Sequence, residues 1–326
     1  MSEEVIRVED LRAYYTMPNN VYVRAVDGVM LKVYRGEILG IAGESGCGKS
    51  TLLRAMYGLI EYPLKVLGGS VLLLTKDEKK FDMTSLGIDR LRKGVWWRYI
   101  SFIPQNAQNV LNPMIRVKDH FIETGKNLGM DEDEILERMN YWIDSLGLSR
   151  DVASAFPIQL SGGMRQRIVI ALAALLEPEV LLADEPTSAL DVVNQRVFVA
   201  SLSKLHKKLR NTVIYVSHDL ELLGIFTHRI AVMYAGKIVE VGKTDEVFEK
   251  PLHPYSKALI DSIPKIGDTR IRKGLSGRPP DLRNPPPGCR FYPRCPYATN
   301  RCRSEEPPLV EVSKGHYVAC WLHAKR

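Results

Sequence analysis

The spacing of apolar and polar residues predicts strands at the N-terminus and a mixture of strands and helices beyond it. Residues 6–41 alternate with a period of two, with turn-forming residues at Pro18-Asn19-Asn20 and at Asp27-Gly28. This pattern predicts short antiparallel strands. Short apolar runs predict further, buried strands at residues 37–42, 68–74, 99–103, 180–183 and 212–216.

Helical spacing separates these strands. It predicts a helix over residues 52–60 that ends near Gly58, helical structure over 115–148, and an apolar helix over 168–176 that stops at Pro178. Acidic residues at 131–134 suit the first turn of a helix. The alternation predicts an α/β fold with a mainly parallel core sheet, an antiparallel β subdomain and an inserted helical subdomain at about residues 106–165.

A glycine-rich stretch joins the strand at 37–42 to the helix that follows it. Strand, glycine-rich turn and helix are the context of a phosphate-binding loop. Backbone N–H groups and the helix N-terminus would face the phosphates, Lys49 would reach the β- and γ-phosphates, and Ser50 would hold Mg²⁺. The loop consists of Gly43, Glu44, Ser45, Gly46, Cys47, Gly48, Lys49, Ser50 and Thr51.

Polar residues follow three of the other predicted strands. Asp184 and Glu185 come directly after four apolar residues, where one carboxylate could hold Mg²⁺ and the next could polarise a water molecule. Gln105 could ligate Mg²⁺, and His218 could contact a γ-phosphate, although each residue alone is more often an ordinary polar side chain. Ligands bind at the carboxyl ends of parallel strands, so this shared location favours one site.

Two more features fit a nucleotide site. Ser161 is placed as the N-cap of a helix, and Gly162 and Gly163 would leave N–H groups open to an anion. Tyr14 and Tyr15 precede the loop by about 28 residues, and an exposed aromatic ring there could stack on a base, although packing on the sheet is the ordinary role of strand tyrosines.

Composition sets limits on location and partners. Hydrophobic residues make up 45% and charged residues 25%, as in soluble globular proteins. No apolar run is long enough to span a bilayer, and the first residues do not resemble a secretion signal, so a cytosolic protein is expected. Residues 265–326 carry 13 Lys/Arg and 5 Asp/Glu within a net charge of +7 for the whole chain. Such a basic tail fits nucleic acid, an anionic surface, or simple packing on the main domain.

Taken together, these motifs resemble those of the ATP-binding-cassette (ABC) ATPases. The resemblance covers residues 5 to about 250 and implies that the chain hydrolyses ATP. It assigns Leu160–Gly163 to the family signature, Asp191 to the loop after Glu185, and Tyr15 to adenine stacking, with Tyr14 as the competing choice. It implies catalytic roles for Lys49, Gln105, Glu185 and His218. It also implies that two cassettes enclose two ATP molecules, with Ser161, Gly162 and Gly163 on the partner's ATP.

The C-terminal part resembles the extension of oligopeptide and dipeptide importer ATPases. Residues 250–259 resemble its opening and residues 287–297 its cysteine-rich end. This implies a nucleotide-binding domain at 1–250 and a small irregular domain at 251–326. It also implies a second, similar ATPase, two permease subunits, an extracellular solute-binding protein, and a place on the cytoplasmic face of the membrane. Relatives with this extension also carry oligosaccharides or nickel, so the solute stays open.

Two other classes compete with an importer subunit. The basic tail fits a soluble ABC protein that acts on nucleic acid or ribosomes, but the chain has no long coiled-coil insertion and no second cassette. The sequence His253-Pro254-Tyr255 argues against an exporter. No nucleic acid partner is therefore expected.

Four of the five cysteines lie in the tail. Cys289, Cys295, Cys302 and Cys320 are separated by five, six and seventeen residues. A cytosolic location disfavours disulfides, and a metal centre would crosslink a segment with little apolar periodicity. Zinc could use four thiolates, or His316 or His323 in place of one, but the close cysteine pairs typical of zinc sites are absent. The resemblance favours a [4Fe–4S] cluster, with zinc as the alternative.

Overall fold

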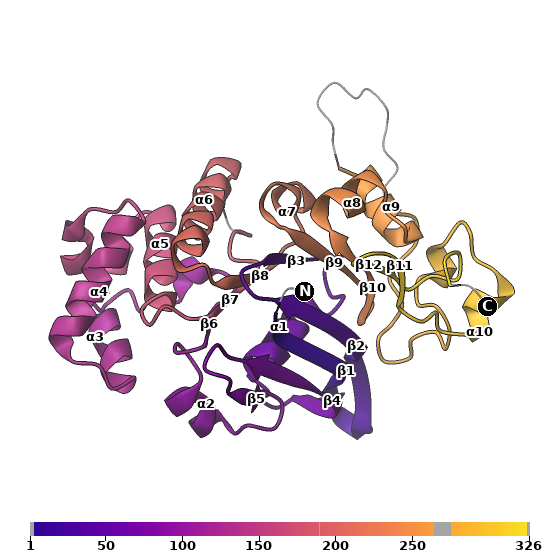
Figure 1. Ribbon diagram of the computed structural model, residues 1–326, viewed down its shortest axis with the longest axis horizontal. Coiled ribbons are helices and arrows are strands. Elements are labelled where there is room, and N and C mark those ends of the chain that lie inside the picture. The colour runs from indigo at the N-terminus through magenta and orange to yellow at the C-terminus, as the bar shows by residue number, and fades with distance from the viewer. Residues whose placement is uncertain (1–2, 189, 264–274, 325–326) are drawn as a thin grey trace. The chain divides into compact units, whose positions relative to one another are not determined.

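The computed structural model describes residues 3–188, 190–263 and 275–324, and its chain forms two compact units (Figure 1). The first unit contains the described residues of Met1–Ser85 and Val216–Arg326, and the second contains those of Leu86–Tyr215. The first therefore joins the two ends of the chain, because strands from both ends share a sheet.

An antiparallel sheet at the start of the chain forms part of the first unit. Its strands are β1 (Glu4–Met17), β2 (Val21–Tyr34), β4 (Leu64–Leu74) and β5 (Lys80–Asp82), in the order β2-β1-β4-β5 (Figure 1). β1 pairs antiparallel with both β2 and β4. The turn predicted at Pro18–Asn20 is present, and Asn19 and Asn20 both adopt positive φ there. The predicted antiparallel subdomain is therefore confirmed.

The turn predicted at Asp27-Gly28 is wrong. β2 continues through both residues, and Leu11 pairs with Val29 while Arg12 pairs with Asp27. Gly28 is the extra residue of a β-bulge, and its φ of 74° is one that glycine adopts without strain. A glycine can mark a bulge as well as a turn, so composition alone did not separate the two.

A second group of strands in the first unit carries the phosphate-binding loop. Its order is β11-β12-β10-β9-β3, and β3 pairs parallel with β9. Helices α1, α7, α8, α9 and α10 belong to the same unit (Figure 1). The strands are β3 (Ile38–Ala42), β9 (Arg229–Tyr234), β10 (Lys237–Lys243), β11 (Val310–Ser313) and β12 (His316–Val318). The helices are α1 (Lys49–Tyr57), α7 (Leu220–Phe226), α8 (Thr244–Glu249), α9 (Pro254–Asp261) and α10 (Asn300–Ser304).

The second unit contains three strands in the order β8-β7-β6 together with the inserted helices. β6 and β7 pair parallel, as the sequence predicted for the core sheet. The strands are β6 (Ile100–Ile103), β7 (Val180–Asp184) and β8 (Thr212–Val216). The helices are α2 (Ile88–Gly94), α3 (Val117–Asn127), α4 (Glu132–Ser145), α5 (Gly162–Ala173) and α6 (Val192–Leu209).

Helix α4 shows why the inserted segment folds as it does. Its buried residues are Ile135, Met139, Trp142 and Ile143, which share one face of a helix. Asp131 stands at the N-cap position and three acidic residues fill the first turn, where they interact favourably with the helix dipole. The predicted helical character of residues 115–148 is therefore confirmed as two helices, α3 and α4.

The C-terminal residues pack on the first unit more closely than their composition indicated. β12 pairs antiparallel with β10, so the tail extends the sheet that carries β3. Phe291 and Val318 are fully or almost fully buried. The sequence shows too few periodic apolar residues to predict this, because the tail uses a surface supplied by residues 229–243.

Candidate functional site

The phosphate-binding loop has the predicted local structure. All five residues of β3 are buried, and α1 begins at Lys49. Gly48 caps α1 with a φ of 108°, and its carbonyl accepts the first helical bond, from the N–H of Leu52, at 2.9 Å. The loop therefore presents its N–H groups at the start of a helix, where the dipole attracts anions.

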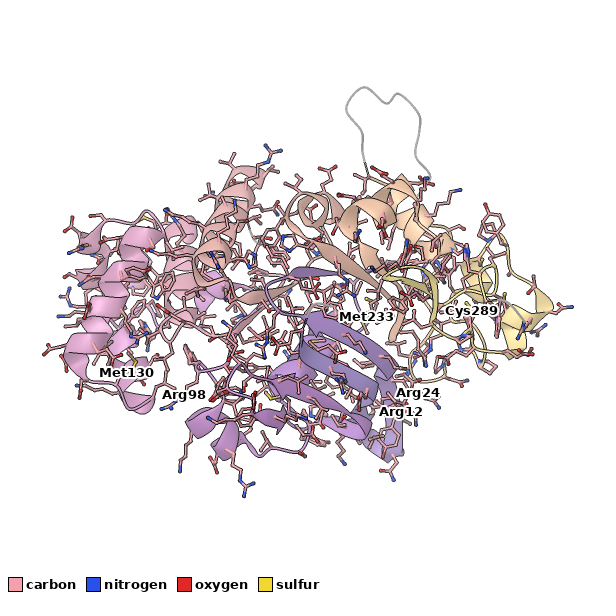
Figure 2. All side chains as sticks on the ribbon, viewed as in Figure 1. Arg12, Arg24, Arg98, Met130, Met233 and Cys289 are labelled. Carbon is pink, nitrogen blue, oxygen red and sulfur yellow. The ribbon has the colours of Figure 1, made fainter. Side chains whose placement is uncertain are left out.

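Two glycines of the loop are fixed by close packing. A Cβ atom on Gly43 would lie 2.2 Å from the carbonyl oxygen of Met233 on β9 (Figure 2). A Cβ atom on Gly48 would lie 1.9 Å from the carbonyl oxygen of Ala25. Both distances are far shorter than any contact with a real Cβ atom. The loop therefore keeps its shape only with glycine at these two positions.

Lys49 lies inside the loop. Its side chain is buried, and its Nζ donates to the carbonyl oxygens of Gly43 and Glu44 at 2.9 and 3.1 Å. The ammonium group is thus held at the centre of the loop, where the sequence predicts the phosphates. Ser50 and Thr51 follow it in the first turn of α1.

The structure separates the two tyrosines. Tyr15 and Thr51 share a hydrogen bond between their hydroxyls at 3.2 Å, so Tyr15 lies beside the loop. Tyr14 donates its hydroxyl to Asp27, and burial together with this bond raises the pKa of Tyr14 to about 12. Adjacent residues of a strand point to opposite faces, so only Tyr15 faces Thr51.

His218 belongs to the first unit with the loop, whereas other predicted site residues belong to the second. His218 is exposed in the turn after β8, one residue before the N-cap of α7. The second unit holds Gln105, Ser161, Gly162, Gly163, Asp184, Glu185 and Asp191.

Asp184 and Glu185 lie where the sequence predicts them. Asp184 is the last residue of β7 and is 4% exposed. Glu185 follows with a φ of 41°, a left-handed conformation that is costly for a residue with a side chain. Such conformations gather at functional sites, where the surrounding structure holds them. This strain is a signal that the sequence did not carry.

The predicted signature segment begins a helix, as expected. Ser161 is the N-cap of α5, and its hydroxyl accepts the N–H of Met164 at 3.2 Å. Gly162 and Gly163 form the first turn. Asp191 caps α6 by accepting the N–H of Asn194, and this bond lowers the pKa of Asp191. Gln105 is exposed after β6.

The four tail cysteines line one cavity in the first unit. The cavity measures about 150 Å³ and is also lined by Phe291, Thr299 and Trp321. Burial, together with the nearby Cys302, Cys320 and Cys295, raises the pKa of Cys289 to about 11. Across residues 3–188, 190–263 and 275–324, no group of three or more His, Cys, Asp or Glu side chains is arranged to hold a metal ion. The cysteine centre therefore stays a prediction.

The two histidines considered as alternative ligands have other partners. His316 Nε2 lies 2.8 Å from Glu240, and His323 Nε2 lies 3.1 Å from the carbonyl oxygen of Leu252. Neither histidine lines the cysteine cavity. This arrangement favours four thiolates over a set in which His316 or His323 replaces one cysteine.

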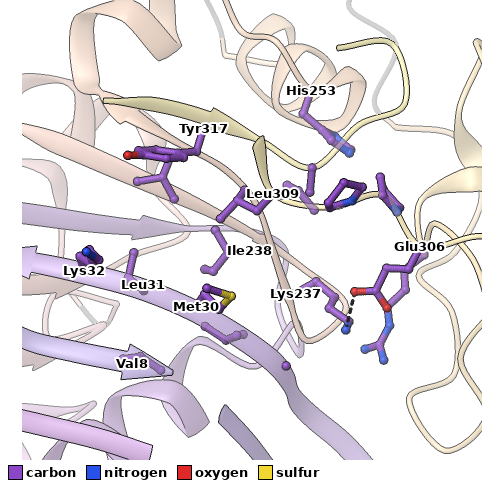
Figure 3. Close-up of a pocket in the computed structure, with 18 of the residues that line it drawn as sticks. Val8, Met30, Leu31, Lys32, Lys237, Ile238, His253, Glu306, Leu309 and Tyr317 are labelled. Carbon is purple, nitrogen blue, oxygen red and sulfur yellow. Dashed lines mark ion pairs between the residues drawn. The ribbon is translucent and has the colours of Figure 1, made fainter. Parts of the chain in front are cut away.

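A larger cavity of about 510 Å³ lies in the same unit (Figure 3). Its walls are mostly apolar and include Met30, Leu31 and Ile238, while Lys237 and Glu306 form an ion pair at its edge at 2.7 Å. It separates part of β2 from the C-terminal segment. No pattern in the sequence predicted this cavity.

Two residues that follow position 250 touch the phosphate-binding loop, and no pattern in the sequence predicted these contacts. Arg294 forms an ion pair with Glu44, and Tyr255 of α9 bonds to the backbone of the same residue. The available signal in the sequence was the position of Arg294, directly before Cys295. Nothing in a linear sequence links it to a partner 250 positions away.

Comparison with known families shows to which family this chain belongs. Residues 26–188, half of the chain, match the family described as ABC transporter. The chain belongs to the ABC transporter family. This ABC protein also matches, over residues 239–302, the family described as oligopeptide/dipeptide transporter, C-terminal region. The resemblances to the ABC ATPases and to the importer extension, which rested on sequence motifs, are confirmed.

Relatives of this ABC protein match along almost its whole length. The dipeptide transport ATP-binding protein DppD of Caldanaerobacter subterraneus subsp. tengcongensis is 40% identical and covers 98% of this chain and 97% of its own. The DppD of Bacillus subtilis is 36% identical, and the match covers 99% of this chain and 96% of its own. The di/tripeptide transport ATP-binding protein DppF of Pseudomonas aeruginosa is 37% identical, and the match covers 98% of this chain and 97% of its own.

Solved structures show the same fold. A dimeric ATP-binding cassette in a post-hydrolysis state, with ADP and Pi bound, has a TM-score of 0.62 at 28% identity and covers 73% of this chain and 98% of its own. The cbiO1 protein of Clostridium perfringens, part of the cbiONQ transporter complex, has a TM-score of 0.63 at 29% identity. The match covers 76% of this chain and 92% of its own. This ABC protein is an ATPase, so the predicted fold class and activity are confirmed.

Within the part of the chain that the structure describes, none of the helices has the length and apolar character required to cross a bilayer. The predicted domain boundary at residue 250 and the roles of individual site residues stay predictions.

Proposed function

We propose that this chain is the ATP-hydrolysing subunit of a membrane importer for dipeptides and oligopeptides. The observation that carries the proposal is the match of residues 239–302 to the oligopeptide/dipeptide transporter C-terminal region. The relatives named for dipeptide and di/tripeptide transport support it, because they match along nearly the whole chain. Oligosaccharide and nickel import are the alternatives for the same machine.

The ATP would bind at the phosphate-binding loop. Lys49 would neutralise the β- and γ-phosphates, and Ser50, Asp184 and Gln105 would hold Mg²⁺, which neutralises charge that develops on the phosphates. Tyr15 would stack on adenine, a role supported by its contact with Thr51. His218 would contact the γ-phosphate.

Glu185 would hold and polarise the attacking water. Its place directly after the buried strand β7 and its left-handed backbone support this role. In-line attack on the γ-phosphorus then releases ADP and phosphate. The protein mainly supplies position and charge for this step.

A second ATPase would complete each site. Ser161, Gly162 and Gly163 would donate N–H groups to the partner's ATP, and Asp191 would lie near the partner subunit. The dimeric cassette among the solved relatives supports this arrangement. Two permease subunits would hold the pair at the cytoplasmic face of the membrane, and an extracellular protein would deliver the solute.

Ser161→Arg is expected to reduce ATP turnover of the assembled importer by more than tenfold while this chain still binds ATP. The bulky cation would block the anion site at the start of α5, which serves the partner's nucleotide in this proposal. Ser149→Arg, at an exposed serine in the same unit, is the matched control. ATP binding and steady-state turnover are measured for both. Native turnover by Ser161→Arg, or by a strictly monomeric chain, contradicts the proposal.

The solute is tested on the extracellular receptor that copurifies with the complex. Calorimetry with a dipeptide, a pentapeptide, a cello-oligosaccharide and Ni²⁺ separates the three candidates. Peptide binding alone that also stimulates ATP turnover supports the proposal. Binding of only the oligosaccharide or only Ni²⁺ overturns the peptide assignment and leaves the ATPase role intact.

We also propose that the cysteine cavity holds a structural [4Fe–4S] cluster, with zinc as the alternative. Four thiols line one small cavity, and His316 and His323 are engaged elsewhere, which fits a centre with four thiolate ligands. Such a centre would crosslink residues 289–320 and hold the tail to the unit.

Anaerobically purified protein is expected to contain about four iron and four acid-labile sulfide per chain, with a broad absorption near 400 nm. Cys302→Ser is expected to lose most of both, because one thiolate ligand is removed. Cys47→Ser, in the phosphate-binding loop, is the matched control and keeps the full metal content. About one zinc per chain without sulfide contradicts the cluster but keeps the site. Absence of both metals, with all four tail cysteines freely alkylated, contradicts the site itself.

A further inference from the structure

Glu44 of the phosphate-binding loop is held by the C-terminal segment. Arg294 Nη1 donates to Glu44 Oε2 at 2.8 Å, and Arg294 Nη2 donates to Oε1 at 2.9 Å. Two parallel bonds between guanidinium and carboxylate fix the orientation of both groups as well as their distance. The side chain of Glu44 therefore has one defined position relative to Arg294.

Arg294 itself is firmly placed. Its side chain is only 4% exposed. Its Nε donates to the carbonyl oxygen of Ser276 at 2.9 Å, and Nη1 also reaches the hydroxyl of Tyr234 at 3.3 Å. The guanidinium lies over the Tyr234 ring at 5.7 Å. A buried, multiply bonded arginine transmits position, whereas an exposed one would move with solvent.

A second contact holds the backbone of Glu44. Its N–H donates to the hydroxyl of Tyr255 at 2.9 Å, and Tyr255 is completely buried. The Tyr255 ring packs against Tyr234 at 4.5 Å and against Phe291 at 5.5 Å between ring centroids. Both the side chain and the main chain of Glu44 are thus bound by residues that follow position 250.

Arg290 makes a separate link to the same loop. Its Nη1 donates to the carbonyl oxygen of Ala235, and its Nη2 pairs with Asp27. The next residue, Gly236, donates its N–H to the carbonyl oxygen of Cys47 at 2.8 Å. Arg290 therefore supports the turn that holds the middle of the loop.

These two arginines stand beside cysteines. Arg290 follows Cys289 directly, and Arg294 precedes Cys295 directly. The N–H of Cys289 also donates to the carbonyl oxygen of Cys302 at 2.8 Å, which ties this short segment to the other side of the cysteine cavity. The cysteines that line the cavity are therefore direct chain neighbours of the two arginines that hold the loop and the turn beside it.

We propose that Arg294 is a positioning residue for the phosphate-binding loop, and that the segment from Cys289 to Cys295 sets the geometry in which the loop meets ATP. This rests on ATP binding at that loop. Lys49 donates to the carbonyl oxygen of Glu44 at 3.1 Å, so Glu44 links the tail to the lysine that faces the phosphates. Arg294 acts through Glu44 and does not touch the nucleotide.

The effect is expected on binding more than on chemistry. Arg294→Gln keeps the size and polarity of the side chain but loses the charge and the paired bonds to Glu44. The loop then samples other geometries before ATP binds, which costs affinity equally in the ground state and the transition state. We expect the Kd and KM for ATP to rise about tenfold while kcat changes less than twofold.

Three variants of the full-length chain test this. Arg294→Lys keeps the positive charge but loses the guanidinium group that makes the two parallel bonds to Glu44. Its KM for ATP is therefore expected between those of the wild type and Arg294→Gln. Arg283→Gln is the matched control, because Arg283 makes an equally bidentate ion pair with Asp281 in the same tail but on the surface. ATP affinity, kcat, KM, melting temperature and hydrogen exchange of the amides of residues 44–48 are measured for each.

Faster exchange of these amides in Arg294→Gln, with raised KM, unchanged kcat and a native metal content, supports the proposal. An unchanged KM and unchanged exchange overturn it, as does an equal change in Arg283→Gln. A lower melting temperature with native KM assigns Arg294 a purely structural role and also overturns it. If the wild-type chain neither binds nor hydrolyses ATP, the ATP site itself fails, so the two failures are distinguishable.

Discussion

Glu185→Gln is expected to lower ATP turnover by a factor of about 10² to 10⁴ while ATP still binds. Glutamine has the shape of glutamate but cannot accept a proton or polarise a water molecule as a carboxylate does. Turnover is measured by phosphate release, and binding by equilibrium titration with labelled ATP. A loss confined to kcat is the signature of an interaction made in the transition state.

The location of Glu185 explains why its effect is expected to exceed that of other acidic residues. It follows five buried residues of β7, and its φ of 41° turns the chain sharply at the strand end. Glu249→Gln, at an exposed glutamate at the end of α8, is the matched control and should retain native turnover. Hydrolysis by Glu185→Gln at near the native rate would assign the water to another residue.

Gly48→Ala is expected to reduce ATP affinity more than a hundredfold and to lower the free energy of unfolding by about 2–4 kcal/mol. Alanine at this position meets two obstacles. The φ of 108° is unfavourable for a side chain, and the new Cβ would lie 1.9 Å from the carbonyl oxygen of Ala25. The loop must shift, and its N–H groups leave the positions in which they would bind phosphate.

Gly46→Ala separates the cost of the backbone conformation from the cost of a steric overlap of the new Cβ atom. Gly46 also has a positive φ, of 76°, but a Cβ atom there meets nothing within 4 Å. Its cost should therefore be only that of the backbone conformation, about 1–2 kcal/mol. Nucleotide titration and chemical unfolding of both variants provide the comparison. Equal effects of the two substitutions would show that the contact with Ala25 does not shape the loop.

Local rules explain what the sequence could predict. Periodicity and turn residues located β1, β2 and β7, and the N-cap role of Ser161 followed from its place before two glycines and an apolar helix. These features depend on neighbours a few positions apart. The motif residues of the nucleotide site could be named for the same reason, since each follows a strand or begins a helix.

Long-range contacts explain what the sequence could not predict. The choice between Tyr14 and Tyr15 depended on which side of β1 faces Thr51. The bulge at Gly28 depended on its pairing with β1. The ion pair between Arg294 and Glu44 joins opposite ends of the chain, and no local pattern encodes such a contact.

ATP-dependent uptake of a labelled peptide into proteoliposomes shows directly whether this chain powers peptide import. The vesicles contain the permeases and both ATPase subunits, with the peptide receptor on the side opposite the ATPases. We expect uptake that requires ATP and that falls by at least tenfold when this chain carries Glu185→Gln. Uptake that is unaffected by Glu185→Gln, or vesicles that hydrolyse ATP without accumulating peptide, would contradict it.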